Sequence, residues 1–186
     1  MRALKGNLPR LVGSKLVIRH LEPHEATLMK KYRVENKVHL EPWEPKRSVE
    51  FFTEGFWQKN LRVNLRDFRE GTSLCMSILT PKEDEVLGVC NYTSLVRGTF
   101  QSCHLGYSLA DRHQGKGLMF EALQLTNRYI FKEMGLHRIM AGYLPQNDRS
   151  GKLLQRLGFE KEGYAREYLK INGRWEDHIL TSLISS

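Results

Sequence analysis

Three consecutive segments in the middle of the chain have the period-two pattern of β-strands: Thr72–Thr80, Glu85–Val96 and Ser102–Leu109. Turn sequences at Pro81–Asp84 and Arg97–Gly98 separate them, which predicts an antiparallel meander. The third segment runs through a Gly-rich turn, Arg112–Gly117, into a long apolar segment with a helical pattern, Leu118–Met134. The chain is therefore organised around a sheet whose last meander strand ends at the beginning of a helix.

The flanking residues predict the other elements. Residues 1–13 are basic with little periodicity and form an expected N-terminal extension. Further elements are expected as a strand at Lys15–His20, helices at 22–34 and 48–68 (the second capped by Ser48), a strand at His137–Leu144, a helix ending at Gly158, and a hairpin around Asn172-Gly173. This order, β, α, α, three β, α, β, α, β, β, predicts an α/β (α+β) fold with helices flanking a sheet, in a single domain, 1–186.

Composition limits the possible classes. The chain has 186 residues, of which 40% are hydrophobic, enough for one substantial core. No apolar run approaches the roughly 18 residues of a spanning helix, so we expect a cytoplasmic protein that binds no membrane. Cys75, Cys90 and Cys103 have no metal-like spacing, and we interpret them as reduced packing residues and expect no metal. The net charge of +8 favours an acidic partner, although it is spread along the chain.

The Gly-rich turn has the features of an anion site. Gly115 and Gly117 let successive amides point at one place, and the following helix adds its free N–H groups and positive dipole end. Arg112 and Lys116 add charge at the rim. A dinucleotide fingerprint requires a glycine where Phe120 stands, and a P-loop requires Ser or Thr at position 117. The alternative, a Gly-rich turn that only caps a helix, stays open at this point.

Arg112-x-x-Gly115-x-Gly117 resembles the pyrophosphate loop of the GNAT superfamily of N-acetyltransferases. The element order is also similar to that fold. Asn147 and Ser150, followed by Gly158-Phe159-x-x-Glu162-Gly163, resemble the Rim subgroup, and the likeness extends from about residue 10 to the end. The resemblance implies a GNAT fold, with a mixed, mostly antiparallel sheet whose central strands four and five splay apart, and acetyl-coenzyme A as co-substrate.

The resemblance also implies roles for particular residues. The pantetheine is expected to pair with the fourth strand, 102–110, up to Leu109. Asn147 is expected to bind the pantetheine, and Ser150 to lie near the sulfur, where its hydroxyl could assist the leaving thiolate. The pyrophosphate is expected to bind Arg112 and the amides of Gln114, Gly115, Lys116, Gly117 and Leu118. From spacing alone, Asn147 could equally be a helix N-cap and Ser150 an ordinary first-turn residue.

The segment His39–Pro45 is expected to be a loop, because two prolines interrupt any helix there. Trp43 between Glu41 and Glu44 could receive a cationic acceptor, and these three residues are the candidate substrate-binding set. The alternative is a Trp packed as a lid over the core, with solvated glutamates.

No motif identifies the general base. Some Rim relatives that acetylate N-termini have a Glu and a Tyr at the positions of Gly142 and Leu154. The candidates left open are a relayed water and the side chains of His104, His113, Glu41, Glu44 and Glu160. An α-amine with a pKa near 8 is about one-tenth neutral at pH 7, a cost of about 1.4 kcal/mol, against about 4.6 kcal/mol for a lysine amine. An N-terminal amine therefore needs a strong base far less than a lysine does.

The expected function is acetylation of the N-terminal alanine α-amine of a ribosomal protein, which the resemblance implies is the fifth protein of the small subunit. This acceptor could be free, or part of the small subunit or its precursor. The acetyl group is expected to transfer directly within a ternary complex. Two alternatives stay open: acetylation of a small amine such as a polyamine or an antibiotic, and a ribosome-assembly role on the same fold. The sequence has no RNP-like aromatic motif, so we expect no sequence-specific nucleic-acid binding. It leaves the oligomeric state open.

Overall fold

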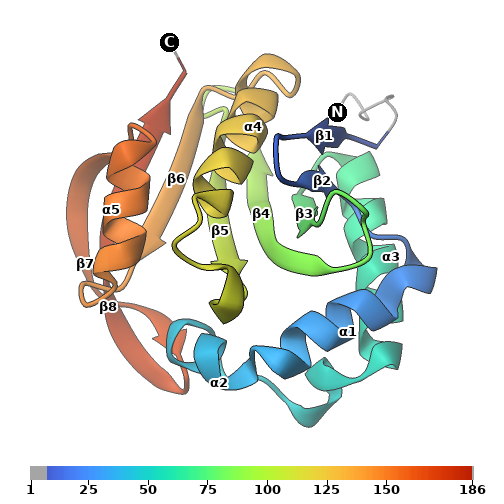
Figure 1. The fold of residues 1–186 in the computed structure, drawn as a ribbon. Helices are drawn as coiled ribbons and strands as arrows, with labels where there is room; N and C mark the ends of the chain where they lie inside the picture. Colours follow the sequence, from blue (N-terminus) through green and yellow to red (C-terminus); the bar gives the residue numbers. More distant parts are fainter. Residues whose placement is uncertain (1–7, 186) are drawn as a thin grey trace.

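One eight-stranded sheet runs through the chain in the order β1-β2-β3-β4-β5-β6-β8-β7 (Figure 1). The computed structural model describes residues 8–185. The strands are β1 Arg10–Val12, β2 Val17–Arg19, β3 Leu74–Leu79, β4 Val86–Val96, β5 Ser102–Leu109, β6 Arg138–Tyr143, β7 Glu160–Ile171 and β8 Arg174–Ile184. The α-helices are α1 Ala26–Glu35, α2 Lys37–Leu40, α3 Glu54–Glu70, α4 Leu118–Lys132 and α5 Asp148–Arg156. Short 3-10 helices are η1 Pro23–Glu25, η2 Glu41–Trp43, η3 Val49–Phe52 and η4 Asp111–His113.

The predicted meander and hairpin are confirmed. β3, β4 and β5 pair antiparallel, with Tyr92 of β4 opposite Leu74 on one side and Leu105 on the other. β7 and β8 pair antiparallel around Asn172 and Gly173, both of which have positive φ, as a tight turn requires. The sheet is mixed and mostly antiparallel, as expected, because β5 and β6 form its one parallel pair in the part of the chain that the structure describes.

The structure differs in detail from the predictions at three places. Part of the expected extension is a strand: β1 pairs antiparallel with β2, whereas residues 1–7 lie outside the described residues. The segment 39–45 is partly helical, since α2 continues into η2 with Pro42 in its first turn, where a missing N–H costs nothing. Ser48 precedes only η3, and Thr53 caps α3 by accepting a hydrogen bond from the Phe56 amide.

The core is divided between the two faces of the sheet. A large cluster lies between the sheet and the helices α4 and α5, and includes Cys103, Leu105, Ile139 and Ala141. A smaller cluster contains side chains of α1 and α3 together with Leu79 of β3 and Val86 and Val89 of β4. Figure 1 shows α4 and α5 in front of the sheet and α1 to α3 at its other side. Because strand residues alternate between faces except at bulges, this division indicates the face on which the core side chains of each strand lie.

The splayed strands expected from the resemblance are β5 and β6. Their parallel pairing covers only Ser102 with Arg138, Cys103 with Ile139 and His104 with Met140. Beyond His104, β5 stays paired with β4 up to Leu109, and β6 stays paired with β8 up to Tyr143. The two strands therefore diverge between intact ladders and leave an opening that leads to the starts of α4 and α5 (Figure 1).

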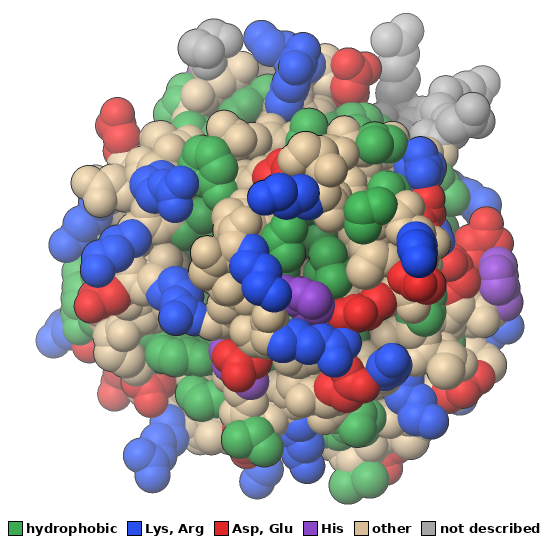
Figure 2. All heavy atoms as spheres, viewed as in Figure 1, with side chains coloured by type: hydrophobic (Ala, Val, Ile, Leu, Met, Phe, Trp, Pro, Cys, Tyr) green, Lys and Arg blue, Asp and Glu red, His purple; other side chains and the backbone are tan. Residues whose placement is uncertain are grey.

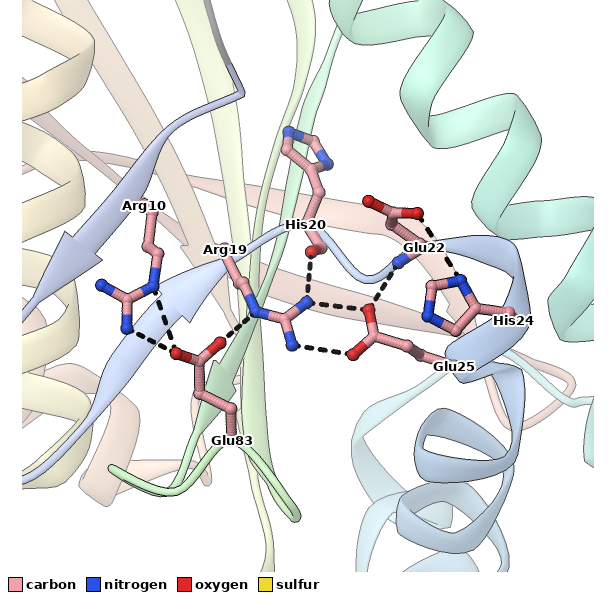
Figure 3. A network of polar contacts seen from close by, with 7 residues as sticks. All are labelled: Arg10, Arg19, His20, Glu22, His24, Glu25 and Glu83. Carbon is pink, nitrogen blue, oxygen red and sulfur yellow. Dashed lines mark hydrogen bonds and ion pairs between the residues drawn. The ribbon is translucent and has the colours of Figure 1, made fainter.

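A charged network fastens the N-terminal strands to the sheet (Figure 3). Arg19 of β2 makes a bidentate contact with Glu25 of η1, at 2.7 and 2.8 Å, and also binds Glu83 in the β3–β4 turn. Glu83 accepts a second contact from Arg10 of β1. Glu25 also accepts the Glu22 amide, which completes a capping box at the start of η1. One arginine thus connects β2, the first helical turn and the meander.

We predict that Arg19→Met lowers the free energy of unfolding by about 2 kcal/mol at pH 7, because it removes several partly buried charge-assisted hydrogen bonds. Contacts with Arg19 and Arg10 lower the pKa values of Glu25 and Glu83. Their stabilisation is therefore present above the unfolded-state pKa near 4.3 and is lost as pH falls through the folded values.

Urea unfolding at several pH values measures this effect. Arg10→Met is the control: Arg10 is more exposed and binds only Glu83, so its loss should cost below about 1 kcal/mol. A deficit in Arg19→Met that stays constant from pH 7 to pH 3 contradicts the electrostatic explanation.

Candidate functional site

The Gly-rich turn forms a group of amides at the start of α4. Gly115 and Gly117 have φ of 73° and 77°, a left-handed conformation that suits glycine. Within residues 8–185, no acceptor is found for the N–H groups of Gly115, Lys116, Gly117 and Leu118. Four successive donors without partners, at a helix N-terminus, suit a pyrophosphate. The Gln114 amide differs, because it already donates to the Asp111 carbonyl at 3.1 Å.

The charges expected at the rim are partly engaged within the protein. The Arg112 guanidinium contacts the carboxylates of Glu85 at 2.7 Å and Glu35 at 3.4 Å. Glu85 also contacts His113, at 2.7 Å. Lys116 donates through Nζ to the Arg112 carbonyl at 2.9 Å, which holds the turn closed. Arg112 therefore positions the loop from one side, and the amide groups remain the part that is free to bind an anion.

Asn147 and Ser150 lie at the start of α5, across the opening from the amide turn. The Asn147 side chain accepts the Ser150 amide at 3.1 Å, so Asn147 is a helix N-cap. This contact uses its oxygen and leaves the NH₂ group for a ligand. Gly151 allows α5 to approach β6 closely, because a Cβ there would lie 2.9 Å from ring atoms of Tyr143. The helix start, and Ser150 with it, is thus held against the end of β6.

The Ser150 hydroxyl makes a contact that the sequence did not suggest. Its Oγ lies 2.6 Å from Oη of Tyr107 on β5. Tyr107 is on the same face as Leu105, and its side chain extends across the opening between β5 and β6. Burial raises the pKa of Tyr107 to about 12, so it remains protonated across the physiological range. A protonated phenol bonded to a serine hydroxyl is a chain that can supply a proton.

The segment expected to bind the acceptor meets the tip of the β7–β8 hairpin. The Asn172 amide donates to the Glu44 carbonyl at 2.9 Å, and Figure 1 shows α2 beside this hairpin. The Glu44 carboxylate is occupied by Arg33 at 2.8 Å and Arg47 at 3.1 Å, rather than being open to an acceptor as expected. Glu44 therefore fixes the loop. Glu41 is exposed and Trp43 is 37% exposed, so both remain accessible.

The candidate bases fall in different places. His113 and Glu44 are engaged in the contacts described above, and Glu160 is exposed at the start of β7. His104 is exposed on β5, on the face opposite Cys103 and Leu105. Among residues 8–185, no group of three or more His, Cys, Asp or Glu side chains could hold a metal ion.

Two of the three cysteines belong to the core, and Cys75 is half-buried. Cys90 and Cys103 are buried in the large cluster. Burial raises the pKa of Cys75 to about 11 and those of Cys90 and Cys103 to about 12. Because the thiolate is the nucleophilic form, these thiols are inert at neutral pH.

Comparisons with known proteins agree with this geometry. A family model described as an acetyltransferase (GNAT) domain matches residues 15–160. The ribosomal protein uS5-alanine N-acetyltransferase of Escherichia coli is 44% identical to this chain over 98% of it and 95% of that protein. The solved ribosomal-protein-S5-alanine acetyltransferase of Vibrio fischeri has a TM-score of 0.91 and 40% identity, covering 95% of this chain and 96% of that one. Mycobacterium smegmatis RimJ in complex with CoA-disulfide has a TM-score of 0.86 and 27% identity, covering 97% and 86%.

We predict that Gly115→Val weakens coenzyme A binding at least tenfold by calorimetry. Valine strains a backbone with φ of 73°, and its side chain would project into the open space that the amides surround. Gly98→Val is a matched control, since Gly98 has φ of 72°, equally open surroundings and a position at the other end of β5. The control should lose similar stability and keep its affinity. Unchanged affinity in Gly115→Val means that the pyrophosphate binds elsewhere.

Proposed function

Because the chain belongs to the GNAT family of acetyltransferases, we propose that it acetylates the N-terminal alanine of a small-subunit ribosomal protein, the fifth, as a single catalytic domain in the cytoplasm. The observation that carries this proposal is 44% identity, over nearly the whole chain, to an enzyme named for that substrate. The family uses acetyl-coenzyme A, and the unpartnered amides at the start of α4 fit its pyrophosphate.

We propose direct transfer, in which the amine attacks the thioester while both substrates are bound. A covalent acetyl-enzyme requires a nucleophile, and the inert core cysteines described above do not provide one. The opening between β5 and β6 supports direct transfer, because the two substrates can meet there from opposite faces of the sheet. The coenzyme binds on the face of α4 and α5, and the amine enters from the opposite face. Holding the two reactants in line in this way provides much of the rate acceleration.

Ser150 and Tyr107 are the proposed acid for the leaving thiolate. Ser150 donates its hydroxyl proton to the sulfur as the carbon–sulfur bond breaks, and Tyr107 replaces that proton across their 2.6 Å contact. The raised pKa of Tyr107 keeps the phenol protonated until the leaving thiolate forms. Asn147 caps α5 through its side-chain oxygen, and we assign its NH₂ group to a hydrogen bond with the pantetheine.

The acceptor site is proposed at η2, between the opening and the hairpin tip. Trp43 limits the size of the first residue, and Glu41 attracts the ammonium group or a nearby basic side chain. Glu44, through its contacts with Arg33, Arg47 and the Asn172 amide, keeps η2 in place. This arrangement selects an N-terminus beginning with a small residue.

Charge distribution favours a protein acceptor over a free polyamine. The chain carries a net charge of +8, which repels polycations such as spermidine. On the face shown in Figure 2, basic side chains are scattered among acidic ones. No helix in the described part of the chain is long and apolar enough to span a membrane.

We predict rapid acetylation of a peptide with a free N-terminal alanine, and no acetylation of the same peptide with a blocked N-terminus and internal lysines. The lysine amine carries the larger deprotonation cost of about 4.6 kcal/mol at pH 7. Mass spectrometry of the products locates the acetyl group. Comparable turnover on the blocked peptide or on spermidine overturns the proposed acceptor.

Trp43→Ala should reduce the preference for N-terminal alanine over leucine at least tenfold, as judged from the ratio of kcat/KM values. Phe100→Ala is the control, since Phe100 is half-exposed in the β4–β5 turn and should leave the ratio unchanged. An unchanged ratio in Trp43→Ala removes η2 from the acceptor site.

We predict that Ser150→Ala and Tyr107→Phe each lower kcat 10- to 100-fold while the Kd for coenzyme A stays constant, because a proton given only as the bond breaks stabilises the transition state alone. The double variant should lose little more than either single one, since the two groups act as a unit. Stopped-flow kinetics and calorimetry separate the two quantities. Asn147→Ala should raise Kd instead. Equal losses of affinity in Ser150→Ala and Asn147→Ala would make Ser150 a binding residue only.

A further inference from the structure

The opening between β5 and β6 has two glycines at its mouth. The last paired residues are His104 and Met140, and Gly106 and Gly142 lie two residues further along each strand. Residues two apart share a face, so both glycines lie opposite Leu105 and Ala141, on the side away from α4 and α5. Both are exposed, and a Cβ on Gly106 would meet nothing within 4 Å. At these two positions β5 and β6 therefore contribute no side chain to the mouth.

His178 of β8 lies next to this mouth. Gly142 pairs with Leu180, and His178 is two residues along β8, hence on the same face. Its Cδ2 atom lies 3.7 Å from the position of a Cβ on Gly142. Since Cδ2 is bonded to Nε2, the Nε2 atom also lies near Gly142.

The other ring nitrogen fixes the tautomer. His178 Nδ1 lies 3.0 Å from the backbone carbonyl of Glu176. A carbonyl oxygen can only accept, so Nδ1 carries the proton and neutral His178 has a bare, basic Nε2. The backbone carbonyl therefore selects this tautomer of the neutral ring.

Nε2 of His178 keeps access to solvent although the residue is only 3% exposed. No partner for this atom is found within residues 8–185. In that part of the chain, three side-chain atoms are both shielded from solvent and without a hydrogen-bond partner: His20 Nε2, Arg33 Nε and Ser102 Oγ. His178 Nε2 is not one of these three, so it is not shielded from solvent. His20 shows the contrast, because burial lowers its pKa to about 4 and its Nε2 is sealed in the core. His178 is packed in position, with one basic atom reaching the surface.

We propose that His178 is the general base that takes a proton from the acceptor α-ammonium, an inference that rests on the proposed function. The ammonium gives one proton to Nε2, and the freed lone pair forms the new nitrogen–carbon bond as the carbon–sulfur bond breaks. After the nitrogen–carbon bond forms, nitrogen loses its second proton to solvent, and Tyr107 takes up one proton from solvent in place of the one that Ser150 gave to sulfur. His178 then returns its proton to solvent, so one proton leaves per turnover.

The groups around His178 suit this role. On β7, the ring of Tyr168 packs against it at 5.6 Å between centroids. On β8, the neighbouring Asp177 accepts hydrogen bonds from the Tyr164 hydroxyl and the Glu167 amide and lies near Arg166. Glu176, also on β8, accepts a hydrogen bond from His178 through its backbone carbonyl. On β6, Gly142 contributes no titratable group. No carboxylate within residues 8–185 forms an ion pair with His178, so Nε2 is open to the substrate.

The test is the pH dependence of kcat/KM for an alanine peptide in His178→Asn, in which the amide NH₂ can still donate to the Glu176 carbonyl. We expect a loss of about 100-fold at pH 7, at the low end of the range for a general base. The deficit should shrink as pH rises past the amine pKa near 8, because solvent then supplies the neutral amine. His137→Asn, at the exposed start of β6, should match the wild type at every pH. Melting temperature and coenzyme affinity should not change in either variant.

Three outcomes overturn the inference: activity of His178→Asn within twofold of wild type at pH 7, a deficit that stays constant up to pH 9.5, or the pH-dependent deficit appearing in His104→Asn instead. An inactive wild type overturns the proposed function and this inference with it. An active wild type with an equally active His178→Asn overturns this inference alone.

Discussion

The loss of pairing between two adjacent parallel strands is the constraint on which the rest of this structure depends. β5 and β6 share three residue pairs and then separate, yet each keeps its ladder with its other neighbour. The separated stretch therefore has backbone groups on its inner edges with no strand to bind, and such groups are costly unless a ligand or water satisfies them. A substrate chain with amide groups can take the place of the missing ladder.

The helices that follow these two strands reinforce that opening. α4 begins shortly after β5 and α5 shortly after β6, so both helix N-termini face the same region. Each contributes unpaired N–H groups and the positive end of a dipole, which attract a polyanion. The proton-handling groups are separated by the sheet: Tyr107 and Ser150 lie on the helix side, and His178 lies on the other. The sheet itself thus keeps the proposed acid and the proposed base from neutralising each other.

Local signals made much of this predictable. The meander, the glycine turn and the Asn172-Gly173 hairpin each depend on residues within a few positions of one another, so the sequence alone reveals them. Long-range contacts were different. Tyr107 and Ser150 are 43 residues apart, and the pairing of Glu44 with Arg33 depends on how α1 and η2 fold back. His178 looked like one more alternating strand residue, because its neighbour Gly142 has no side chain to mark the contact. The choice of Thr53 over Ser48 as cap was a local error, since both have the right chemistry and only the bend after η3 decides between them.

The hydrogen bond from the Asn172 amide to the Glu44 carbonyl joins two segments that are distant in sequence. It involves only backbone atoms, so neither side chain is needed to maintain it. Substitutions in η2 that leave the Glu44 ion pairs and the positive-φ turn at Asn172-Gly173 intact can therefore accumulate while the two segments stay docked. Acceptor recognition can therefore diverge among related proteins while the coenzyme site stays the same. The same scaffold can in this way give rise to enzymes with different protein targets.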